Sequence, residues 1–202
     1  MLFRSEYNKA KEHHEKSLAI KQEIGDQKGK APTYVNLGIV FLSLSEYARA
    51  KEYLVKALMM YQEAGERMEE AICHGNIGIV LQRLGQYLEA KNCHEKCLKI
   101  RREIGNKEGE ASSYCNLGTV FLDLGEYTEA RGYFERAIEI VVKTGDKLVE
   151  AKCYGNLGNV FQHLGKYRKA QDCYQKALFI EQEIGHKKGE AACYGNQGNL
   201  FQ

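Results

Sequence analysis

The residues best suited to chemistry are cysteines and histidines in the middle of the chain. Cys93 and His94 are adjacent, Cys97 follows, and Cys73 and His74 form a second pair upstream. Thiolates and imidazoles are preferred ligands of Zn²⁺, and residues at i and i+4 share one face of a helix. A zinc site is therefore one interpretation of these five residues.

A repeated core is the other interpretation, and we favour it. Cys73 recurs as Cys153 and Cys193, and Cys93 recurs as Cys173, always at multiples of a 40-residue spacing. Aromatic residues take the places of both histidines in other repeats, and alanine takes the place of the last cysteine of the cluster. Such positions are typical of a packed core. We therefore predict no metal site, no catalytic cysteine and no cofactor.

Two other patterns resemble functional motifs only superficially. Residues 155–159 read Gly-Asn-Leu-Gly-Asn, but no strand is expected before them and their glycines fall within a predicted helix, unlike those of a phosphate loop. The six histidines are scattered, and none is in register with a serine nucleophile and a carboxylate. We therefore predict no catalytic residue and no enzymatic activity.

The strongest pattern in the sequence is a repeat of 40 residues. The segment Tyr-Val-Asn-Leu-Gly at residues 34–38 returns four times with its asparagine and last glycine kept. These further copies begin at His74, Tyr114, Tyr154 and Tyr194. A second segment, Leu-Gly-x-Tyr-x-x-Ala, is also repeated, with Ser45 in place of glycine in its first copy. The repeat therefore sets the register for the whole chain.

Each repeat carries the apolar pattern of two helices. With Ala31 counted as position 1, apolar or aromatic residues at positions 4, 7 and 11 share one helix face at about 100° per residue. After a short turn, positions 20, 24, 27 and 28 form a second stripe. We call the two predicted helices A and B. A cap glycine is expected at the end of helix B (Gly25, Gly65, Gly105, Gly145 and Gly185), followed by N-cap candidates Asp26, Asn106 and Asp146.

Small residues predict where helices A and B approach each other. Glycine is kept at position 8 of helix A, and alanine is kept at position 20 of helix B, so we expect the two to face each other. One helix pair cannot bury both of its stripes, so neighbouring pairs must stack. The A helices are then expected to line a concave groove, with the B helices outside.

The repeat resembles a known family. In residues 107–146, the pattern resembles the tetratricopeptide repeat consensus at Tyr114, Leu117, Gly118, Phe121, Ala130, Phe134 and Ala137. The unit departs from that consensus in having 40 residues instead of 34, and in having no proline at position 32. The longer unit looks like the repeats of the LGN/Pins G-protein signalling modulators. The resemblance implies an all-α fold, a right-handed α-solenoid of antiparallel helix pairs with about ten helices.

The repeat divides residues 1–202 into one predicted array. We expect a partial unit at 1–26, full units at 27–66, 67–106, 107–146 and 147–186, and a partial unit at 187–202. Tyr194, Leu200 and Phe201 would then lack a following helix B, so end-to-end self-association is a further expectation. The chain has the pattern of a piece of a longer array.

Composition restricts the class of partner. The net charge is +2, from 29 basic and 27 acidic residues, with no basic cluster for nucleic acid or for a membrane surface. The seven cysteines are an odd number without a disulfide spacing, and no apolar stretch suggests a signal peptide or a membrane span. We therefore expect a cytoplasmic protein that binds a protein or peptide, without nucleic acid and without a membrane.

Polar residues on the predicted groove face are the candidate binding site. Position 6 is asparagine in all five copies, although asparagine is a weak helix former. An amide can donate to and accept from the backbone of an extended peptide, and the resemblance to LGN-type repeats implies such a grip. The alternative is that each asparagine bonds a neighbouring helix. The candidates are Asn36, Asn76, Asn116, Asn156, Asn196, Asn159, Asn199, Gln82, Arg83, Asp123, Gln162 and His163.

Two functions are compatible with this pattern. The first is a non-enzymatic scaffold that binds an extended peptide segment of a partner along the groove. The second is a structural spacer or sensor arm of a larger protein that associates through its ends. Repeat arrays share one frame among many partners, so the pattern does not name the ligand.

Overall fold

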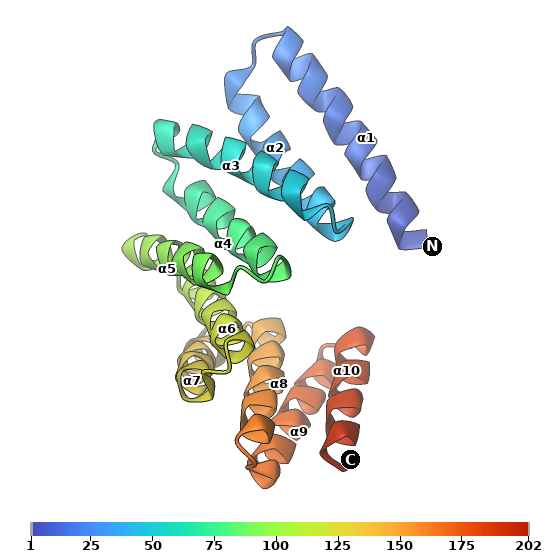
Figure 1. Cartoon of the computed structure of the whole chain (residues 1–202), viewed down its shortest axis with the longest axis vertical. Coiled ribbons are helices and arrows are strands. Elements are labelled where there is room, and N and C mark those ends of the chain that lie inside the picture. The colour runs from blue at the N-terminus through green and yellow to red at the C-terminus, as the bar shows by residue number, and fades with distance from the viewer. Residues whose placement is uncertain (1, 202) are drawn as a thin grey trace. The chain divides into compact units, whose positions relative to one another are not determined.

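The computed structural model describes the backbone of residues 2–201 and the side chains of residues 4–200 (Figure 1). The predicted all-α class is confirmed, because the described residues form ten α-helices, a short 3-10 helix and no strand. The helices are α1 (Leu2–Glu23), α2 (Gln27–Ser43), α3 (Tyr47–Ala64), α4 (Arg67–Arg83), α5 (Tyr87–Glu103), α6 (Lys107–Asp123), α7 (Tyr127–Thr144), α8 (Lys147–His163), α9 (Tyr167–Glu183), α10 (Lys187–Gly198) and η1 (Asn199–Phe201).

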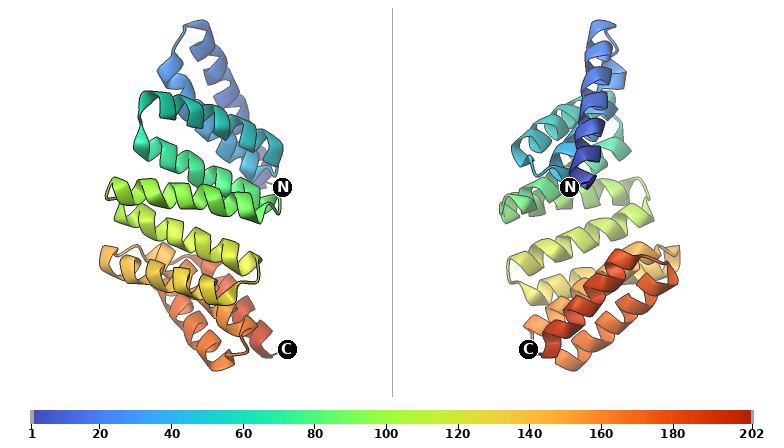
Figure 2. Two further views of the ribbon diagram at one scale, coloured as in Figure 1. Left: turned by 60° about the vertical axis from the view of Figure 1, so that its left-hand side comes forward. Right: turned by 90° about the vertical axis from the view of Figure 1, so that its right-hand side faces the viewer.

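The chain forms two compact units, Met1–Ile100 and Arg101–Gln202, which we call the N-terminal and C-terminal units. In the N-terminal unit, α1 packs on α2, α2 on α3 and α3 on α4. In the C-terminal unit, α6, α7, α8, α9 and α10 pack in chain order, and α6 also contacts α8. Figure 2 shows the successive helices of each unit side by side and antiparallel. Helices α2, α4, α6, α8 and α10 are the A helices of the repeat, and α1, α3, α5, α7 and α9 are the B helices.

Capping residues end and begin these helices where the sequence predicts. All five predicted cap glycines adopt a positive φ, between 68° and 81°. The side chains of Asp26, Asn106 and Asp146 accept hydrogen bonds from the backbone N–H groups of Gly29, Gly109 and Val149, at 2.8, 2.9 and 3.1 Å. These N-caps satisfy donors that helix geometry leaves unpaired. The short linkers between helices therefore follow from residues within them.

The glycine at position 8 has a different main neighbour from the one predicted. A Cβ atom built on Gly38 would lie 2.6 Å from Leu54 Cγ, whereas the Ala50 carbonyl oxygen is 3.3 Å away. The same construction on Gly118 would meet Phe134 Cε1 at 2.7 Å. The side chain at position 24 of helix B therefore lies directly over the glycine, and at Gly38 the alanine at position 20 is the second neighbour. Glycine is needed because any side chain would displace a core residue.

Polar contacts at position 31 join a B helix to the next A helix. In the N-terminal unit, Lys21 Nζ donates to the Gly29 carbonyl and to Thr33 Oγ1, both at 2.8 Å. In the C-terminal unit, Arg101 Nη1 donates to the Gly109 carbonyl at 2.6 Å and to Ser113 Oγ at 3.1 Å. In the other copies, tyrosine, valine or glutamate replaces the basic residue, and cysteine replaces the hydroxyl residue. These paired exchanges were not identified from the sequence.

No described helix is both long enough and apolar enough to serve as a candidate membrane span.

Candidate functional site

The five asparagines at position 6 lie away from the fully buried core. Asn36 on α2 is exposed, whereas Asn76 on α4, Asn116 on α6, Asn156 on α8 and Asn196 on α10 are half-buried. The N-terminal unit holds Asn36 and Asn76, and the C-terminal unit holds the other three. Each amide is therefore on a surface that solvent reaches, as a ligand contact requires.

One of these asparagines also has a partner inside the protein. The Asn156 side chain hydrogen-bonds the Cys115 thiol of α6, and Cys153 of α8 hydrogen-bonds the same sulfur. The Cys153 contact lowers the pKa of the Cys115 thiol against the effect of burial, and Lys152 and Asn156 lower it further. Asn156 therefore helps to join α8 to α6, which supports the structural interpretation at this position.

Three other candidates are held by the core. The Tyr174 hydroxyl lies 2.7 Å from Asn159 Oδ1 and 2.8 Å from Gln162 Oε1, and burial raises the pKa of Tyr174 to about 12. His94 Nε2 lies 3.1 Å from Gln82 Oε1. Tyr174 and His94 both occupy position 24 and are fully buried. The amides of Asn159, Gln82 and Gln162 therefore satisfy buried polar groups of their own repeat, and their direct contact with a ligand stays a prediction.

A sequence signal for this packing exists and was missed. Positions 12 and 24 change together along the chain. The pairs are Leu42 with Leu54, Gln82 with His94, Leu122 with Phe134, and Gln162 with Tyr174. In the four full repeats, glutamine appears at position 12 only where position 24 carries a polar atom, since a buried hydroxyl or imidazole needs a hydrogen-bond partner. Comparing the repeats at positions 12 and 24 together would have indicated that these glutamines bond the core.

The remaining candidates lie at the C-terminal ends of A helices. Arg83, Asp123 and His163, all at position 13, are exposed, and so is Asn199 in η1. The His163 ring stacks on the Tyr127 ring, with centroids 4.9 Å apart and planes 6° apart. The predicted end-to-end association involved Tyr194 and Phe201. Tyr194 is 54% exposed, and the side chain of Phe201 lies outside the described residues. These side chains are accessible to a partner.

The cysteine and histidine cluster is buried in the core except for Cys93, which is half-buried. His94 is fully buried and His74 is nearly so. Burial lowers the pKa of the His74 imidazole and raises that of the Cys73 thiol to about 12. Among the described residues, no group of three or more His, Cys, Asp or Glu side chains is placed to hold a metal ion. Burial favours the protonated thiol of Cys73, which is not the form that binds a metal ion, so this arrangement favours packing over ligation at Cys73.

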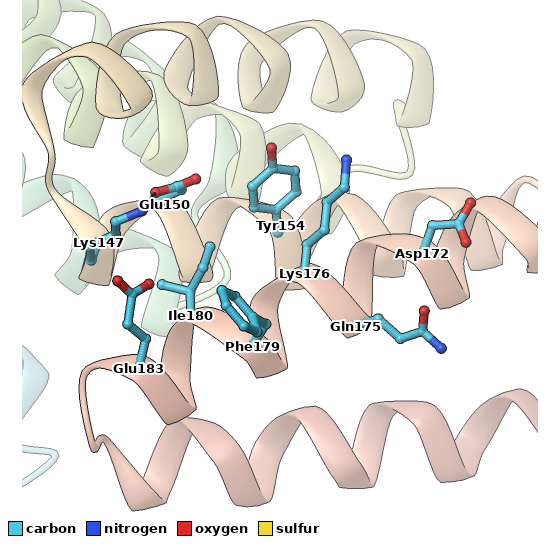
Figure 3. Close-up of a pocket in the computed structure, with 9 residues that line it drawn as sticks. All are labelled: Lys147, Glu150, Tyr154, Asp172, Gln175, Lys176, Phe179, Ile180 and Glu183. Atoms are coloured by element: carbon cyan, nitrogen blue, oxygen red, sulfur yellow. Dashed lines mark hydrogen bonds and ion pairs between the residues drawn. The ribbon is translucent and has the colours of Figure 1, made fainter.

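Each unit has a surface hollow, and the two differ in charge. The hollow of the C-terminal unit, of 540 Å³, lies between α8 and α9, and its side chains surround Tyr154 and Phe179 (Figure 3). Its charges are partly neutralised, because Lys147 pairs with Glu150 at 3.1 Å and Lys176 Nζ lies 5.2 Å from the Tyr154 ring centroid. The hollow of the N-terminal unit, of 730 Å³, is bounded by α2, α3 and the start of α4, and carboxylates dominate its charge.

Comparisons with known proteins agree with this architecture. A family model described as tetratricopeptide repeat matches residues 2–63, 69–143 and 118–180. The chain is similar in fold to the apo form of RapI, at a TM-score of 0.88 and 22% identity, over 100% of this chain and 73% of that one. No curated protein matches the chain.

Two further solved structures are similar. The Rap conjugation gene regulator of plasmid pLS20, in complex with the Phr* peptide, matches at a TM-score of 0.79 and 19% identity, over 95% of this chain and 53% of that one. Repeats of a putative kinesin light chain from Podosopora anserina match at 0.73 and 16% identity, over 90% and 89%. At these identities the likeness concerns the fold alone. Because the family model covers most of the residues and the helix pairs have the expected packing, the chain belongs to the tetratricopeptide repeat family.

Proposed function

We propose that this chain is a non-enzymatic scaffold that holds an extended peptide segment of a partner protein along its A helices. The observation that carries the proposal is the asparagine at position 6 in every copy, on a surface that solvent reaches. An amide there can donate to and accept from the backbone of a peptide without selecting its side chains. A structure with a similar fold contains a bound peptide, which supports the same use of the fold.

The ligand contacts are not shared equally by the candidate residues. Asn36, Asn76, Asn116 and Asn196 are the main proposed contacts, because Asn156 already bonds Cys115. Arg83, Asp123, His163 and Asn199 are exposed nearby in the sequence register and could add contacts at the C-terminal ends of the A helices. Asn159, Gln82 and Gln162 act on the ligand indirectly, by fixing the helix B residue behind that surface.

The finer features of the proposal have separate support. Balanced charge favours a protein partner over nucleic acid. All seven cysteines are free thiols, which supports a reducing compartment such as the cytoplasm. The closer likeness to LGN/Pins repeats is also a proposal. It rests on the 40-residue unit and on segments such as 155–159, whereas the solved structures above are Rap and kinesin light chain repeats.

The test is peptide capture from a random displayed library. Wild-type protein is compared with Asn36→Ala/Asn76→Ala, and Asn92→Ala serves as the matched control, since Asn92 is an exposed asparagine on helix B α5. We expect the double variant to lose the peptides that the control keeps, while circular dichroism shows equal helicity. Equal capture by all three proteins would contradict the proposal.

The second candidate function is a spacer or sensor arm that associates through its ends. Tyr194 favours it, because this aromatic residue is 54% exposed on α10, whereas its counterpart Tyr114 in a full repeat is 9% exposed. Oligomers that grow with protein concentration, that Tyr194→Ser removes and that the asparagine variants leave unchanged would support this alternative.

A further inference from the structure

The hollow of the N-terminal unit has an apolar floor. Met60, Tyr61 and Ala64 of α3 line it together with Ala31 and Pro32 of α2. Met60 and Tyr61 are half-buried, so part of each side chain still faces solvent. A surface of this kind accepts the aliphatic part of a long side chain, and the tyrosine ring can stack on a guanidinium group.

Three carboxylates surround this floor. Glu63 comes from the last turn of α3, Glu66 precedes α4, and Glu69 lies in its first turn, while Lys28 is the only basic residue in the lining. Among the described residues, none of the three glutamates has an ion pair. The next residue, Glu70, differs, because it pairs with Arg67 at 2.5 Å and accepts from Gln62 at 3.1 Å. We call this site the acidic hollow.

The helix dipole does not account for all of this charge. Carboxylates at the start of α4 are favoured by the positive end of the helix, which explains Glu66 and Glu69 taken singly. Glu63 lies at the opposite, negative end of α3, where a carboxylate is disfavoured. Burial raises the pKa of the Tyr61 hydroxyl, and Cys73, Glu69 and Glu66 raise it further, as expected for a negative potential in the hollow.

Three residues that differ from those at the same position in every other copy of the repeat complete the hollow. Glu69 occupies position 39, which is glycine or valine in every other copy, and Tyr61 is the only aromatic residue at position 31. Pro32 is the only proline of the chain and lies inside α2. Proline has no N–H, so the Lys28 carbonyl one turn earlier has no helical donor and can accept a hydrogen bond from a ligand. The hollow thus presents several acceptors around an apolar floor.

The acidic hollow adjoins the surface of the proposed peptide site. Pro32 and Asn36 are four residues apart on α2, so they lie on the same face of that helix, one turn from each other. A peptide that contacts Asn36 can therefore place a side chain over Pro32. The asparagines alone also leave binding weak, because the small net gain from each hydrogen bond only offsets the cost of association.

We propose that the acidic hollow is the anchor site for a lysine or arginine side chain of the bound peptide. The inference rests on the proposed function. The basic head group lies among Glu63, Glu66 and Glu69 and donates to a carboxylate or to the Lys28 carbonyl. Its aliphatic stem covers Met60 and Tyr61. Charge complementarity selects this occupant, because an acidic or purely apolar side chain would leave three unpaired carboxylates facing it.

The experiment selects peptides from a random displayed library on the wild-type protein and on Glu63→Gln/Glu69→Gln. Glu89→Gln/Glu95→Gln is the matched control, because it makes the same charge change at two exposed glutamates of α5. We expect wild type and control to enrich lysine or arginine at one fixed place in the peptides. The hollow variant loses that preference and binds the wild-type peptide about tenfold more weakly.

A second measurement tests whether the basic residue of the peptide contacts the acidic hollow directly. The basic residue of the selected peptide is replaced by methionine, and the loss of affinity is compared between wild type and the hollow variant. A smaller loss in the variant supports direct contact, whereas equal losses would overturn the acidic hollow. Thermal unfolding followed by circular dichroism checks that the variant stays folded.

Failure of the two proposals can be told apart. If no peptide is captured, or if Asn36→Ala/Asn76→Ala captures the same peptides as wild type, the proposed peptide-binding function is wrong. If capture depends on these asparagines, but the peptides are not enriched in lysine or arginine and Glu63→Gln/Glu69→Gln binds them as wild type does, only the proposal for the acidic hollow is overturned.

Discussion

Repeats 27–66 and 107–146 fill the space between helix A and helix B differently from repeats 67–106 and 147–186. The first two place Leu54 or Phe134 over the position 8 glycine, with leucine at position 12. The other two place His94 or Tyr174 there, with glutamine at position 12. We call them the apolar repeats and the polar repeats. The comparison shows that a buried polar side chain is accompanied by a hydrogen-bond partner in the same repeat, even when the sequence pattern places that partner on the surface.

The largest expected effect comes from closing the space that both kinds of repeat share. Gly118→Leu should destabilise the protein by about 3 kcal/mol or more, because its Cβ alone would lie 2.7 Å from Phe134 Cε1. Urea unfolding measures the loss. Gly198→Leu is the control, since a Cβ at Gly198 would meet no atom within 4 Å. Equal losses in both variants would show that the contact with Phe134 is not what requires the glycine.

A smaller effect should come from breaking the partnership in a polar repeat. Gln162→Leu should cost about 1–2 kcal/mol, because the Tyr174 hydroxyl loses one of its two amide neighbours. Tyr174→Phe in the same protein converts the repeat to the apolar kind and should recover much of the loss. The free energies of unfolding of both single variants and the double variant test this coupling. Additive losses would mean that the glutamine does not serve the hydroxyl.

The two apolar repeats differ from each other in the turn between helices A and B. Ser45 has a φ of 64°, whereas glycine occupies the same place in the other three full repeats. Ser45→Gly should stabilise the N-terminal unit by about 1 kcal/mol, because a non-glycine residue is strained in the left-handed region. A higher midpoint of thermal unfolding is the expected result. An unchanged or lower midpoint would mean that added freedom of the unfolded chain offsets the relieved strain.

The smallest effect concerns pH dependence in a polar repeat. Burial lowers the pKa of His74 in the folded state from 6.5, so the unfolded chain takes up its proton first. His74 therefore reduces stability as pH falls below about 6.5, and stability is restored as pH rises. His74→Tyr introduces the residue found at this position in the four other copies and should flatten this part of the profile. Melting temperatures across that pH range test it, and an unchanged slope would assign the dependence to other groups.

Much of the fold could be predicted because each helix pair repeats local signals. Cap glycines, N-cap side chains and apolar stripes act within a few residues of one another, and five copies made them easy to identify. The neighbour of the position 8 glycine was harder to predict. Both positions 20 and 24 lie on the inner face of helix B, and only packing shows that Leu54 comes closer than Ala50.

The candidate site could be predicted less well. Helical periodicity placed Asn36 and Gln82 on similar faces, yet Asn36 is exposed and Gln82 bonds buried His94. Periodicity gives the direction of a side chain from its own helix axis, but not which neighbouring residue reaches it. The acidic hollow was missed for the same reason, because its glutamates come from two helices and the residue between them.

The sequence by itself determined the class of helix, the ends of the helices and the family, because these depend on contacts between residues close in the chain or on a pattern repeated five times. The tertiary structure decided which polar residues bond the core and which remain exposed to solvent. That division depends on residues twelve or more positions apart, such as Gln162 and Tyr174, whose distance is set only when the helices pack.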